Sequence, residues 1–118
     1  MGTFHVAIQI GDPRVSSFET LEALVDTGAS YTWVPASVLR RLGVESTFRF
    51  PFLLADGRRI EREMAETRVR LDSRERTTLV VFGDEGTQSL LGAYILEGFG
   101  LAPDPVNRRL IPVPGLLM

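Results

Sequence analysis

The sequence has 118 residues, 44% of them hydrophobic and 24% charged, which is the balance of a folded globular domain and excludes a disordered or fibrous chain. The net charge is −2 and all 13 cationic residues are Arg, so no strong positive field draws the protein to nucleic acid or to an anionic membrane. The absence of Cys excludes a disulfide framework, a Cys-ligated zinc site and a thiol nucleophile.

The start of the chain lacks the basic residues and apolar run of a signal peptide. No apolar stretch approaches the roughly 20 residues that a membrane-spanning helix needs. We therefore expect a single domain over residues 1–118, located in the cytoplasm, with neither a membrane nor a nucleic acid as partner.

Alternating apolar residues predict a first strand at residues 4–10, followed by a turn at 11–14. A second strand at 18–25 runs directly into Asp26-Thr27-Gly28, and a third is predicted at 31–34. The tripeptide therefore lies in a loop between two strands.

A helix of about two turns is predicted at residues 36–42, with Gly43 as its left-handed stop. The runs 48–54 and 60–71 flank Ala55-Asp56-Gly57-Arg58, and Asp-Gly between two strand-like runs is a strong hairpin signal. Apolar residues move from even to odd positions within the second run, which predicts a bulge or a bend in that arm.

A compact strand at residues 77–82 comes next, and Leu90-Leu91-Gly92 then leads into a short helix at 93–97 that Gly98 would close. The prolines around residues 109–113 allow a last strand only at a sheet edge. The elements add up to a mostly β protein with two short helices and no linkers or repeats.

Asp26 is the strongest candidate for a chemical role. Its carboxylate stands between an apolar strand and a run of small residues, where it is partly desolvated and a backbone can approach it. An Asx turn is the alternative, because Asp and Gly are ordinary turn residues and an isolated Asp-Thr-Gly is a plain turn in most proteins. The tripeptide alone does not decide between these interpretations.

The wider pattern resembles the retroviral-like, or retropepsin-like, aspartic peptidases over essentially the whole chain. Residues 23–34 resemble their active-site loop, Leu90-Leu91-Gly92 resembles the element that crosses beneath it, and the hairpin between them stands where the flap belongs. The resemblance implies an all-β, retropepsin-like closed β-barrel that forms one lobe. Pepsin-like enzymes carry two such loops in one chain, and this chain has one, so a homodimer is implied.

The resemblance also assigns roles to residues. Asp26 would be the catalytic residue, in an active-site loop with Thr27, Gly28 and Ala29, and Ala55, Asp56, Gly57 and Arg58 would form the flap. Two close carboxylates share a proton, so one activates a water while the other polarises the scissile carbonyl of a peptide or protein substrate. Thr27 would link the two loops, and Gly28 would admit the substrate backbone. Neither a metal nor an organic cofactor is implied.

Two departures from the retroviral pattern occur together. Retroviral enzymes often pair an Asp in this loop with an Arg after the helix glycine, and the corresponding residues here are Ser30 and Ala93. Because both charges are lost, no unpaired buried charge is left and we expect the scaffold to persist. The flap is polar rather than Gly-rich, so the main alternative function is an inactive homodimeric binding or scaffold domain with the same fold.

Three other features have simpler interpretations. His5, the only His, lies on the polar side of the first strand and has no second His or Cys to form a triad or metal site. Residues 56–76 mix Arg with acidic residues, which favours a solvated hairpin face over a nucleic-acid stripe. For Trp33, packing in the core is favoured over contact with a substrate.

Overall fold

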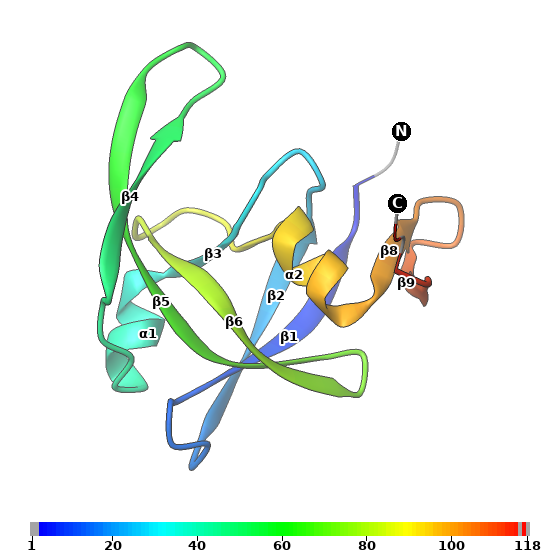
Figure 1. The fold of residues 1–118 in the computed structure, drawn as a ribbon, viewed down its shortest axis with the longest axis horizontal. Helices are drawn as coiled ribbons and strands as arrows, with labels where there is room; N and C mark the ends of the chain where they lie inside the picture. The colour runs from blue at the N-terminus through cyan, green and yellow to red at the C-terminus, as the bar shows by residue number, and fades with distance from the viewer. Residues whose placement is uncertain (1–2, 116, 118) are drawn as a thin grey trace.

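The computed structural model describes residues 3–115 and 117, and most of them lie in β-strands. Figure 1 shows the ribbon. In chain order the elements are β1 (His5–Gly11), β2 (Phe18–Val25), β3 (Thr32–Pro35), α1 (Ala36–Arg41), β4 (Phe48–Leu53), β5 (Arg59–Leu71), β6 (Arg74–Gly83), β7 (Leu90–Leu91), α2 (Ala93–Phe99), β8 (Leu101–Asp104) and β9 (Arg109–Pro112). Within the described part, neither helix is long and apolar enough to cross a membrane.

Seven strands form one sheet in the order β1-β2-β7-β3-β6-β5-β4. Strand β1 also pairs with β5, through Gln9 with Arg70 and Ile10 with Val69, so the strand pairings return to β1 and form a closed ring. Only β4 of these strands lies outside the ring. This arrangement confirms the predicted all-β fold with two short helices.

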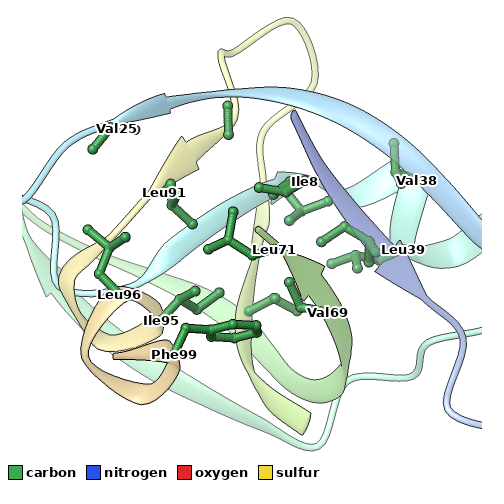
Figure 2. Packing of buried hydrophobic residues seen from close by; sticks show 14 of the residues in the cluster. Ile8, Val25, Val38, Leu39, Val69, Leu71, Leu91, Ile95, Leu96 and Phe99 are labelled. Carbon is green, nitrogen blue, oxygen red and sulfur yellow. The ribbon is translucent and has the colours of Figure 1, made fainter. Parts of the chain in front are cut away.

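The hydrophobic core lies inside this ring, and α2 covers one end of it. Ile95, Leu96 and Phe99 are buried on one side of the helix and meet Leu91 and Val69 from the sheet, as Figure 2 shows. Burial of one large apolar side chain contributes about 1.5–3 kcal/mol. The core therefore holds α2, and with it the segment just before the helix, firmly against the sheet.

The second helix ends later than the sequence predicts. It continues through Gly98 to Phe99, and Gly100 ends it with a φ of +67°, a left-handed conformation that glycine adopts without strain. The extension brings the Phe99 ring into the core. In the first helix, by contrast, Gly43 has a φ of +78°, as its predicted role as a left-handed stop requires.

The chain after α2 forms a small separate sheet. Strand β9 pairs with β8, and both lie outside the seven-stranded sheet. The sequence predicts β9 but not β8, because the four residues of β8 include a proline and show no clear alternation. The edge position expected for residues 109–113 is found in this two-stranded sheet.

The long strand β5 bends without a bulge. Its pairing with β4 continues to Met64, and its pairing with β6 begins at the same residue, so no residue is left out of register. Met64 and Ala65 are both fully buried although neighbours in a strand point to opposite faces. The phase change in the sequence therefore marks a place where both faces are covered, and Figure 1 shows β5 curving through it.

Strand β4 lies at the end of the strand order and has one open edge. The Leu54 N–H donates to the Arg58 carbonyl across the hairpin at 2.8 Å. Because amides alternate in direction along a strand, the position of Pro51 faces the open edge. Pro51 has no N–H, so this edge lacks a donor in its middle.

Candidate active site

Asp26 comes directly after β2, which pairs in parallel with the short β7. The Asp26 N–H donates to the Leu91 carbonyl at 3.0 Å, and its carbonyl accepts the Ala29 N–H at 3.1 Å. Its Oδ1 accepts the Gly28 N–H at 3.0 Å. These hydrogen bonds fix the backbone that carries the carboxylate. The side chain is half-buried, so the carboxylate remains accessible.

The start of α2 is hydrogen-bonded to the same loop. The first N–H groups of a helix have no partner within the helix, and here the loop accepts two of them. The Ala93 N–H donates to the Ala29 carbonyl and the Tyr94 N–H to the Ser30 carbonyl, both at 2.9 Å. The segments where retroviral enzymes often place an ion pair are therefore joined here by backbone hydrogen bonds.

Gly92 lies at the tightest point of this contact. Its N–H donates to Thr32 Oγ1 at 3.0 Å, and Thr32 is fully buried. A Cβ at Gly92 would lie 2.7 Å from the Tyr31 carbonyl carbon and oxygen and 2.9 Å from the Ala29 carbonyl oxygen. Only glycine fits without moving the loop that carries Asp26.

A hollow of about 580 Å³ lies beside the Asp26 carboxylate. Its lining comes from the loop after β2 (residue 26 and residues 28–31), from Trp33 in β3, from residues 50–55 in β4 and the flap, and from Leu90 in β7. Asp26 is the only carboxylate among these lining residues. The hollow therefore presents one ionisable acid within a largely apolar and aromatic surface.

Four of these residues form what we term the aromatic wall: Tyr31, Trp33, Phe50 and Phe52. The Tyr31 ring lies 5.6 Å from Phe50 and 6.2 Å from Phe52, both edge to face, and Trp33 lies 5.6 Å from Phe52. Phe50 and Phe52 are two apart in β4 and therefore share one side of the strand. The wall joins the active-site loop to the base of the flap hairpin.

The flap tip is held only by its own turn. Gly57 has a φ of +90° and its N–H donates to the Leu54 carbonyl at 2.9 Å. The Arg58 N–H and guanidinium both donate to the Asp56 carboxylate, and they hold the pKa of Asp56 below its usual range. Residues 55–59 are exposed, and Figure 1 shows the hairpin projecting from the body at the end where the loop after β2 lies.

The structure brings together some of the predicted site residues. Asp26, Gly28, Ala29 and Ala55 line the hollow, whereas Thr27 is exposed beside it and residues 56–58 lie beyond it. Thr27 is open to solvent in the single chain, and its expected role across a dimer axis stays a prediction.

The aromatic wall was not predicted from the sequence. The signal was present as Phe48, Phe50 and Phe52 at alternate positions of one strand, which places them on the same side. Trp33 differs from expectation, since it lines the hollow and lies outside the main core cluster. Its contact with Phe52 explains this, because the side of β3 that bears Trp33 faces β4 rather than the interior.

Within the mixed-charge stretch at residues 56–76, several side chains pair with near neighbours in the sequence. Arg70 and Arg68 donate to the Glu75 carboxylate and lower its pKa, Arg70 having the larger effect, which agrees with a solvated hairpin face. His5 is exposed beside the Gln88 side chain. Within residues 3–115 and 117, no three His, Cys, Asp or Glu side chains come close enough together to hold a metal ion.

This geometry can be compared with known proteins. The family model described as "gag-polyprotein putative aspartyl protease" matches residues 14–98, which include the loop, the flap and most of α2. The chain belongs to this aspartyl protease family. The match confirms the resemblance that the loop, the flap hairpin and Leu90-Leu91-Gly92 indicate in the sequence.

Solved structures of aspartic proteases and of a protease-like domain have a fold similar to that of this chain. The EIAV protease, solved with the inhibitor HBY-793, is 19% identical with a TM-score of 0.59, over 84% of this chain and 89% of that chain. A retropepsin-like aspartic protease from Rickettsia conorii is 24% identical with a TM-score of 0.55, over 87% and 88%. The retroviral protease-like domain of Ddi1 from Leishmania major is 18% identical with a TM-score of 0.57, over 92% and 88%. No curated protein matches the sequence significantly.

Proposed function

We propose that this chain is an aspartic endopeptidase whose active site is completed by a second copy of the chain. The observation that carries the proposal is the Asp26 carboxylate, half-buried at the mouth of a largely apolar hollow and fixed through its backbone and Oδ1. Membership of the aspartyl protease family supports the reaction class. One chain supplies one such carboxylate, and the reaction needs two.

In a symmetric dimer the two Asp26 side chains would lie close together and share one proton, since two like charges in contact resist full ionisation. The ionised member would take a proton from a bound water, which attacks the scissile carbonyl. The protonated member would polarise that carbonyl and then protonate the leaving amine. Thr27, exposed beside the loop, would join the two loops, and Gly28 would accept the substrate backbone.

The flap at residues 55–58 would cover the substrate during the reaction. Its exposed, locally bonded turn supports this role, because a cover must leave and return without breaking the core. The substrate would be an extended segment of a peptide or protein, with an apolar side chain toward the hollow. The rate is expected to be highest at mildly acidic pH and to fall as the shared proton is lost.

A peptide-library digest at pH 4 to 7 tests the proposal, with wild type beside Asp26→Asn. Wild type should cleave, and the variant should lose activity in both subunits at once while it keeps its fold and its oligomeric state. Sedimentation under the same conditions should show a dimer. A strict monomer that cleaves peptides would exclude the shared pair of carboxylates, and a dimer that cleaves nothing would be a binding or scaffold domain.

A further inference from the structure

Tyr31 occupies a special position in the aromatic wall. Its ring contacts Phe50 and Phe52 of β4 and also lies 5.5 Å from the ring of Tyr94 in α2. It therefore touches both the base of the flap hairpin and the helix that supports the active-site loop. Tyr31 itself belongs to that loop, five residues after Asp26.

The hairpin has few other attachments to the body. Strand β5 pairs with β6 only from Met64 onward, so the part of the hairpin beyond Met64 is paired only with itself. It reaches the body through the Phe50 and Phe52 rings, through an ion pair of Arg62 with Asp84 at 2.8 Å, and through a longer contact of Glu63 with Arg40 in α1 at 3.9 Å. The Asp84 partner lies on the loop after β6, whereas the aromatic contacts lead directly to the active-site loop.

We propose that Tyr31 is a positioning residue, which anchors the flap hairpin over the hollow by packing its ring against Phe50 and Phe52 of β4. This inference rests on the proposed peptidase function, which gives the hairpin its role as a cover. Tyr31 need not touch the reacting atoms. It sets how far the base of the hairpin stands from Asp26, and hence how readily the tip closes over a peptide.

The physical basis is the edge-to-face packing of the rings. Each aromatic pair changes an equilibrium constant by about two- to tenfold, and Tyr31 makes two such pairs with β4. Truncation to Tyr31→Ala should therefore raise the open population of the hairpin roughly tenfold or more. The backbone bonds that hold Asp26 do not involve the Tyr31 ring, so the carboxylate should keep its place.

Two measurements on the full-length protein test this anchor. Hydrogen exchange should be faster by about tenfold at residues 50–58 in Tyr31→Ala, with no change at residues 24–26. In peptide cleavage, KM should rise several-fold with little change in kcat. Tyr31→Phe should restore both values, because the ring and not the hydroxyl makes the contacts.

Tyr94→Ala is the matched control, since its ring pairs with Tyr31 and, among the described residues, with no aromatic ring of β4, and it is already 48% exposed. It should leave exchange at residues 50–58 near the wild-type rate. Phe50→Ala removes the same contact from the flap side and should also speed exchange at residues 50–58. It keeps the proposal testable if Tyr31→Ala does not fold. Unchanged exchange in both Tyr31→Ala and Phe50→Ala would overturn the proposal, as would equal effects of Tyr94→Ala.

The exchange experiment separates this inference from the proposed function. If wild type cleaves no peptide, the peptidase proposal fails, while faster exchange in Tyr31→Ala would still show the anchor. If wild type cleaves and Tyr31→Ala changes neither exchange nor KM, the peptidase proposal stands and the anchor fails. A fall in kcat with unchanged KM would place Tyr31 in support of Asp26 and would also contradict the proposal.

Discussion

The active-site loop and the flap tip face the same hollow but are held in different ways. The loop at residues 26–32 is tied to β7 and the start of α2 by backbone hydrogen bonds, and α2 is fixed in turn by buried side chains. The tip at residues 55–58 is exposed, and the backbone hydrogen bonds of its turn are made with Leu54 and Arg58 of the same hairpin. One hollow thus has a fixed side that orients a carboxylate and a side that we expect to move without disturbing it.

Gly92→Ala is the strongest way to break the fixed side. The new Cβ would lie 2.7 Å from backbone atoms of Tyr31, which cannot rotate away as a side chain could. We expect a loss of about 2–5 kcal/mol in the free energy of unfolding, measured by denaturant titration.

Gly98→Ala is the matched control, in the helix that Gly92 precedes. Nothing lies within 4 Å of a Cβ there, and the residue has helical backbone in the last turn of α2. Alanine should stabilise the protein by about 0.5–1 kcal/mol. If both variants changed stability alike, helix propensity rather than the loop contact would explain the result.

Hydrogen exchange compares the two regions directly in wild type. Amides at residues 24–26 donate to carbonyls of neighbouring strands and loops within the body, whereas those at 55–59 are in an exposed turn. We expect at least about a hundredfold stronger protection at residues 24–26, equivalent to about 3 kcal/mol in opening free energy. Equal protection would mean that the hairpin is not a movable cover.

Thr32→Val tests one polar contact on the fixed side. Valine has nearly the same shape but cannot accept the Gly92 N–H, which would be left buried without a partner. The expected cost is about 1–3 kcal/mol in unfolding free energy. Thr32→Ser keeps the acceptor and should lose less, and a neutral Thr32→Val would show that this hydrogen bond contributes nothing.

Asp56→Asn should have the smallest effect, because the Asp56 carboxylate is exposed on the movable side. The folded pKa is lowered by Arg58, so the carboxylate stabilises the turn above the unfolded pKa of about 3.9, and this effect disappears as pH falls through the folded pKa. An NMR titration should show Asp56 protonating below the usual Asp range. Global stability near neutral pH should fall only slightly in Asp56→Asn, because solvent screens this exposed pair, and a large loss would place the tip among the fixed elements.

Local patterns in the sequence predict much of this fold. Strand β2 and the hairpin around Asp56-Gly57 follow from alternation and turn chemistry, which act over a few residues. The end of α2 depended on a non-local contact, since the helix extends past Gly98 because Phe99 is buried in the core. Strand β8 exists through pairing with β9, which its own four residues do not reveal.

The candidate site likewise has one part that local patterns predict and another that depends on non-local contacts. The position of Asp26 in a loop after β2 was predictable, because an apolar strand followed by small residues is a local pattern, and its catalytic role stays a prediction. The aromatic wall was not predictable, because it requires Tyr31 and Phe50 to meet across the hollow. The crossing of Leu90-Leu91-Gly92 beneath the loop was expected from resemblance alone, and the hydrogen bonds that make this contact could be seen only in the structure.

Pro51 has a consequence for how the protein behaves at high concentration. An open strand edge rich in aromatic side chains is a template on which other chains can add strands and start aggregates. As the proposed cover, the flap hairpin would have to stay free of the body, so it could not protect this edge by burying it. A missing amide in the middle of β4 interrupts the ladder that an added strand would need, and so guards the exposed hairpin against aggregation.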